Sequence, residues 1–182
     1  MTTTEPELAA RLRESLAQAD RELGYLRETA AALAPLLPCS TEVLTRLEER
    51  RESRDLLVAF AARFGLLQEM LQGTVFRAVA LLEEERPESN RMLVELMGRL
   101  GIVASAQDFL EDRRHRNVLA HVYVGDEARR ADALNYIYQR VDALSGILDQ
   151  AHRHVERRLA SDQAQASGEG RSTPDHDVPR RR

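Results

Sequence analysis

The chain has no lysine or tryptophan, one cysteine and few aromatic residues. The single cysteine, Cys39, excludes both an internal disulfide framework and a cysteine-based zinc site. Because aromatic residues make up only 4% of the sequence, we expect no platform on which single-stranded bases stack. The 26 basic residues are all arginine and the net charge is −4, which argues against a general nucleic-acid coat but leaves room for a local basic site.

Membrane segments and several common catalytic signatures are missing as well. No apolar run approaches the ~20 residues that a membrane span needs, and no N-terminal signal pattern is present. We therefore expect a soluble, cytoplasmic protein without a membrane partner. The sequence has no Gly-rich phosphate loop, no Gly-x-Ser-x-Gly and no paired aspartates of a nucleotidyltransferase, and we expect neither a metal site nor a cofactor.

Apolar residues recur every three or four positions along most of the chain, which is typical of one face of an α-helix. No segment alternates with period two, so we predict no strand. Ser40 and Ser105 are suited to cap helices, and Gly65 or Gly73 is expected to kink the long second helix. The pattern predicts helices over residues 5–34, 41–85, 88–100, 105–122 and 127–160.

These helices predict an all-α fold, an antiparallel bundle of four to five helices over residues 5–160. Gly, Ser, Gln, Pro and charged residues dominate residues 161–182, which predicts a disordered C-terminal tail. His152 and His154 lie near the expected end of the last helix. We interpret them as cations that interact favourably with the helix dipole there. A metal site is not expected, since no carboxylate stands at ligand spacing on the same face.

Residues 116–123, Arg-Asn-Val-Leu-Ala-His-Val-Tyr, are the most informative stretch of the sequence. They combine a permanent cation, an imidazole and a phenol in an apolar helical pattern. The guanidinium of Arg116 can hold a phosphate with a planar fork of donors, and His121 can move protons near neutral pH. Together they are a minimal set of groups for cutting or binding a phosphodiester.

The spacing Arg-x4-His alone is weak support, because it recurs at Arg171 and His176 in the tail. The fuller pattern Arg-Asn-x3-His-x-Tyr should arise by chance roughly 3 times in 10,000 chains of this composition. A structural interpretation stays open beside the chemical one. In it, His121 borders the core, Arg116 forms a surface ion pair and Tyr123 is an aromatic of the bundle.

Arg116 and His121 lie about 140° apart on a regular helix, so they are not neighbours on one face. Two copies that meet at a twofold axis would bring these groups together more readily. A homodimer also supplies two imidazoles, one to act as base and one as acid, where a single chain offers only one suitable histidine.

The pattern Arg116-Asn117-x3-His121-x-Tyr123, late in an all-helical chain, resembles the signature of the HEPN superfamily. In particular it resembles the HepT-like toxins, whose motif is Arg-x4-His-x-Tyr. The resemblance covers about residues 5–160.

This resemblance implies a metal-independent endoribonuclease that acts on RNA as a homodimer. His121 would be the general acid or base, Arg116 would steady the charged phosphorane, and Asn117 would position the phosphate or His121. The implied partner is a small nucleotidyltransferase antitoxin that adds AMP to Tyr123.

The motif is preceded by Arg113 and Arg114, a more basic segment than the family leads us to expect, and one that is suited to contact RNA. Some members of the family keep the fold and are not nucleases. The alternative function is therefore a non-catalytic helical subunit that binds nucleotide or substrate for a separate nucleotidyltransferase.

Overall fold

The computed structural model of the protein describes residues 5–120 and 126–169, and these residues form helices and no strand. The predicted all-α fold is confirmed. The α-helices are α1 (Glu5–Leu33), α2 (Thr41–Glu49), α3 (Arg51–Met70), α4 (Phe76–Leu82), α5 (Asn90–Arg99), α6 (Ala106–Ala120), α7 (Glu127–Gln139) and α8 (Val141–Glu169). A short 3-10 helix, η1 (Ala34–Leu36), follows α1, and a π-helical segment, η2 (Leu71–Val75), joins α3 to α4.

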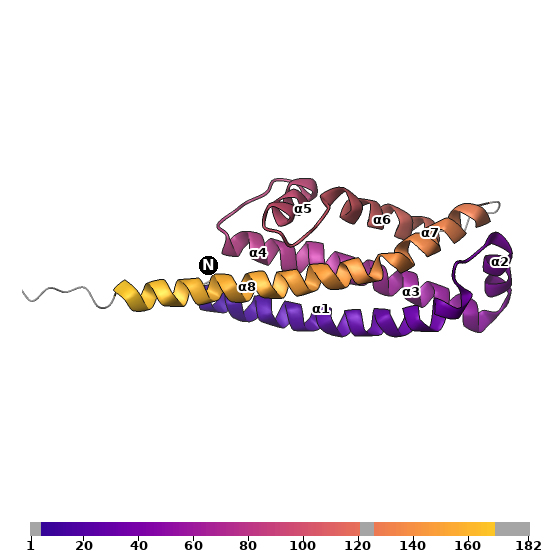
Figure 1. Cartoon of the computed structure of the whole chain (residues 1–182), viewed down its shortest axis with the longest axis horizontal. Helices are drawn as coiled ribbons and strands as arrows, with labels where there is room; N and C mark the ends of the chain where they lie inside the picture. Colours follow the sequence, from indigo (N-terminus) through magenta and orange to yellow (C-terminus); the bar gives the residue numbers. More distant parts are fainter. Residues whose placement is uncertain (1–4, 121–125, 170–182) are drawn as a thin grey trace, which may run out of the picture.

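Two long helices, α1 and α8, run side by side along the length of the bundle (Figure 1). The helix formed by α3, η2 and α4 packs against α1, and α6 packs in turn on α3 and α7. One continuous core connects them, and Leu12, Phe60 and Leu148 are fully buried in it. Burial of these leucine and phenylalanine stripes is the main stabilising contribution, about 1.5–3 kcal/mol for each fully buried large side chain.

The two predicted serine caps are confirmed, whereas Asp126, at the N-cap of α7, makes no capping hydrogen bond with its side chain. The Ser40 hydroxyl accepts a hydrogen bond from the Val43 amide at 3.3 Å, and the Ser105 hydroxyl accepts one from the Asp108 amide at 3.1 Å. Gly101 has φ of 72°, the left-handed backbone that ends a helix at low cost for glycine.

The predicted helix over 41–85 is divided at a position that has no glycine or proline. Arg50 is extended, with φ −96° and ψ 122°, and it separates α2 from α3. This break lets α2 turn away and pack on α7 (Figure 1). Of the two candidate glycines, Gly73 lies within the π-helical segment, whereas Gly65 lies inside regular α3.

The last predicted helix also differs from the observed one. It is interrupted at Arg140, between α7 and α8, and α8 continues to Glu169. Residues 161–169, predicted as tail, are therefore helical, and residues 170–182 lie outside the described part of the chain. Within the described residues, none of the helices combines the length and the apolar character that crossing a membrane requires.

Candidate functional site

The first half of the motif lies in the last two turns of α6. Arg113, Arg114 and Asn117 are exposed, whereas Arg116 is half-buried and turns toward α3. His121 and Tyr123 lie outside the described residues, so the structure places the arginine and the asparagine of the motif but not the histidine or the tyrosine.

Arg116 is held against α3 by shape and by charge. Its Nη2 donates a hydrogen bond to Glu69 Oε1 at 3.0 Å, and its side chain is only 19% exposed. The guanidinium passes so close to Gly65 that a Cβ at that position would stand 2.9 Å from Nε. Glycine at position 65 thus permits this close approach, and a larger residue would force the Arg116 side chain to shift.

The contact with Glu69 leaves Arg116 available to a stronger anion. Glu69 is 66% exposed, and solvent-exposed ion pairs of this kind contribute about 0–1 kcal/mol. Within the described residues the Arg116 Nε has no hydrogen-bond partner, and it is closed off from solvent. A phosphate can therefore replace the weak, solvated partner only at the outer nitrogens of the guanidinium.

A pocket of about 540 Å³ opens beside Arg116, between α2, α3, α6 and α7. Its walls are mainly apolar, and three arginines and one glutamate border it. The apolar residues are Leu57, Val58, Ala61, Ala62, Leu119 and Ala120, and the charged residues are Glu48, Arg54, Arg116 and Arg130.

Arg130 and Glu48 form an ion pair at this pocket between Nη1 and Oε1. The pair joins α7 to α2, and the Arg130 side chain is only 7% exposed. In the described part of the chain, the Nε of Arg130, like that of Arg116, is buried and has no hydrogen-bond partner. The sequence does not indicate this pair, because its members lie in different helices and neither belongs to a motif.

A second polar cluster lies beneath α6 and fixes the orientation of the helix. Asp112 is fully buried and accepts hydrogen bonds from Arg140, with Nε at 2.7 Å from Oδ1 and Nη2 at 3.2 Å from Oδ2. Burial raises the pKa of Asp112, although the Arg140 guanidinium opposes this shift. Burial and the nearby Asp112 carboxylate together raise the pKa of Tyr136 to about 12. The ring of His115 stacks on that of Tyr136, with centroids 3.9 Å apart.

The inner face of α6 carries both Arg116, which borders the pocket, and Asp112, which pairs with Arg140. Phe109, Asp112, Arg116 and Leu119 recur at helical spacing, and all of them face the bundle. Two of these four inner positions carry charge. A charged residue on a stripe that is otherwise apolar is the sequence signal that could have indicated Asp112, whereas Arg116 was predicted from the motif.

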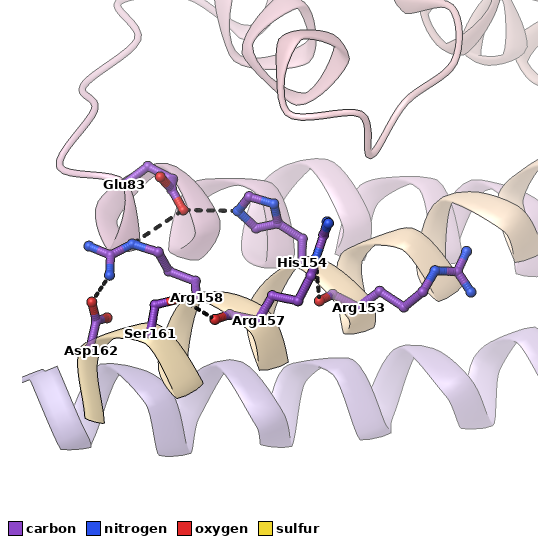
Figure 2. Close-up of polar contacts among 7 residues, drawn as sticks. All are labelled: Glu83, Arg153, His154, Arg157, Arg158, Ser161 and Asp162. Atoms are coloured by element: carbon purple, nitrogen blue, oxygen red, sulfur yellow. Dashed lines mark hydrogen bonds and ion pairs between the residues drawn. The ribbon is translucent and has the colours of Figure 1, made fainter. Parts of the chain in front are cut away.

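The histidines of α8 have a different role from the one predicted. His154 Nε2 lies 2.9 Å from Glu83 Oε1 at the end of α4, and Arg158 Nε lies 3.7 Å from the same oxygen (Figure 2). His152 Nε2 lies 3.0 Å from Asp20 of α1. Because α8 continues to Glu169, neither histidine is at a helix end, and the dipole interpretation was wrong.

These histidine contacts pair each imidazole with a carboxylate from a neighbouring helix. Among the residues that the structure describes, no group of three or more histidine, cysteine, aspartate or glutamate side chains is placed to hold a metal ion.

No family model matches the chain, and neither a curated protein nor a solved structure matches it. The resemblance to HepT-like proteins therefore rests on the motif at residues 116–123 and on its place in an all-helical chain.

Proposed function

We propose that this protein is a metal-independent endoribonuclease of the HepT-like kind, which acts in the cytoplasm as a homodimer. Arg116 and His121 are its principal catalytic residues and Asn117 assists them. The observation that supports the proposal is the position of Arg116. Arg116 lies against Gly65 of α3, and its ion-pair partner is the exposed Glu69. A pocket adjoins it.

The proposed reaction is an internal transfer at phosphorus. His121 accepts the proton of a ribose 2′-hydroxyl, and the 2′-oxygen attacks the neighbouring phosphorus. The bond from phosphorus to the 5′-oxygen breaks, and the partner subunit's His121 donates a proton to that leaving oxygen. The products are a 2′,3′-cyclic phosphate and a 5′-hydroxyl end, so the substrate must be RNA rather than DNA.

Arg116 contributes charge stabilisation in this reaction. The phosphorane carries more negative charge on its non-bridging oxygens than the starting phosphodiester does, and a preorganised donor contributes most to the more charged species. Asn117, exposed on the adjacent position of α6, would hold the phosphate or orient His121. The exposed Arg113 and Arg114 would contact the RNA backbone one turn earlier.

Tyr123 would be the regulatory residue. A nucleotidyltransferase antitoxin would transfer AMP to its phenolic oxygen, and each AMP carries a phosphodiester with about one negative charge. This charge, two residues from His121, would repel the RNA backbone by the same electrostatic rule that governs phosphorylation.

The pocket favours one second candidate function. Its mainly apolar walls and its volume are typical of a small-ligand site, as in a non-catalytic subunit that binds nucleotide for a separate nucleotidyltransferase. Expression of the chain alone separates the two functions, because growth arrest is expected only of the nuclease.

The direct test is cleavage of a labelled RNA by the purified full chain in EDTA. We expect products that end in a 2′,3′-cyclic phosphate and a 5′-hydroxyl. Cleavage that requires an added divalent metal would contradict the proposed mechanism.

A further inference from the structure

The pocket beside Arg116 has an apolar middle and charged ends. Along α3 it is bordered by Arg54, then by Val58 and Ala62, and at its far end by the guanidinium of Arg116 over Gly65. From residue 54 to residue 65 the helix rises roughly 16 Å. This length is sufficient for one nucleotide unit with a phosphate at an end.

The charges of this pocket favour an anionic occupant. Among the described residues, three arginines and one glutamate border it, and even with Glu69, the partner of Arg116, the charges leave an excess of one positive, although the whole chain is negative. Arg130 is more than nine-tenths buried and paired with Glu48, so it forms a fixed part of the pocket border. The Arg116 side chain is 19% exposed, and an anion in the pocket would meet the exposed part of its guanidinium.

The walls favour a flat ligand with apolar faces. Leu57 and Ala61 of α3 and Leu119 of α6 provide the apolar surfaces. The Glu48–Arg130 pair provides one acceptor and one donor group at the border. A nucleobase has this character, since its faces are apolar and its edge carries donors and acceptors.

We propose that this pocket is a nucleotide subsite, in which a phosphate binds at Arg116 and the attached base lies between Val58 and Leu119. The inference rests on the proposed function and deepens it, because the subsite would hold the nucleotide next to the scissile phosphate. The Glu48–Arg130 pair would contact the edge of that base and so influence which RNA sequences are cleaved.

The absence of tryptophan provides a sensitive test. Val58→Trp places the sole tryptophan on the pocket wall, at a side chain that is 63% exposed in the wild type. Ala10→Trp places it on an exposed position in the first half of α1, and α1 begins at the end of the bundle far from α2 (Figure 1). Each variant is titrated with nucleoside monophosphates, the matching nucleosides and inorganic phosphate, while tryptophan emission is recorded.

We expect saturable quenching of the Val58→Trp variant by nucleoside monophosphates, and only the linear absorbance effect in Ala10→Trp. Nucleosides and inorganic phosphate should each bind at least 10-fold more weakly than the monophosphates, because each fills only half of the subsite. Equal affinity for inorganic phosphate would overturn the base-binding half of the proposal. No saturable quenching at millimolar nucleotide, together with no nucleotide binding by the wild-type chain in titration calorimetry, would overturn all of it.

The RNA cleavage assay of the wild-type chain separates this inference from the proposed function. RNA cleavage without nucleotide binding would leave the ribonuclease and remove the subsite. Nucleotide binding without RNA cleavage would keep the subsite and favour the non-catalytic subunit.

Discussion

Gly65→Ala should separate the activity of the protein from its stability. The new Cβ would stand 2.9 Å from Nε and 3.1 Å from Cδ and Cζ of Arg116, where ordinary contact begins near 3.4 Å. The guanidinium must therefore move away from Gly65 by about half an ångström. Misplacement of a catalytic group by about 1 Å can cost about 10²-fold in rate, so for about half that shift we expect a loss on the order of 10-fold.

The free energy of unfolding should hardly change in the same variant. Alanine within a helix is favoured over glycine by about 0.5–1 kcal/mol. This gain offsets the loss of the Arg116 contact with exposed Glu69, which contributes at most about 1 kcal/mol. The side chain that must move is flexible, so we expect unfolding midpoints in urea within experimental error of the wild type.

Gly24→Ala is the matched control. Gly24 is an exposed helical glycine in α1, and a Cβ there meets nothing within 4 Å. This variant should be slightly more stable and fully active on RNA. If Gly65→Ala cleaves RNA at the wild-type rate, the position of Arg116 against α3 is irrelevant to catalysis and the reasoning from the close approach fails.

Three further predictions concern assembly, regulation and the cluster beneath α6. Light scattering at micromolar concentration should give the mass of a homodimer, and a monomer that still cleaves RNA would exclude the shared site. Tyr123→Phe should remain an active nuclease, and intact-mass spectrometry after co-expression with a cognate nucleotidyltransferase should show AMP additions on the wild type only; equal modification of both would remove Tyr123 from the mechanism. Asp112→Asn should lower the free energy of unfolding by up to about 3 kcal/mol, because it removes the charge partner of Arg140, which is still 22% exposed. In that variant the pKa of Tyr136, about 12 in the wild type, should fall because a neighbouring negative charge is lost, but it should stay above the ordinary value because burial, the larger cause, remains. Absorbance at 295 nm would show the change, and an unchanged pKa would contradict the contribution assigned to Asp112.

The helices themselves could be predicted because their signals are local. The apolar stripe of α1 and the serine caps at Ser40 and Ser105 act within one or two turns of the chain, and the structure confirms them. The breaks at Arg50 and Arg140 could not be predicted in this way, since both residues favour helices. Arg140 at its break forms the ion pair with Asp112, 28 residues away, and no local pattern indicates such a contact.

The candidate site likewise has one part that a local motif predicts and another that depends on contacts between helices. Arg116 could be predicted as a candidate site residue because it belongs to a compact motif. The residues that hold it, Gly65 and Glu69, come from α3, and the pocket that adjoins it depends on Glu48 and Arg130 from two other helices. Gly65 was interpreted as a potential kink because a glycine needed for close approach of another helix looks the same in sequence.

The rate of RNA cleavage by the full chain in EDTA, compared between the wild type and His121→Ala, tests the central claim most directly. The two proteins should have the same circular dichroism, and His176→Ala, which alters the tail copy of the spacing, serves as the control. We predict a loss of about 10²–10⁴-fold for His121→Ala and the wild-type rate for His176→Ala. Cleavage by His121→Ala at the wild-type rate would contradict the account.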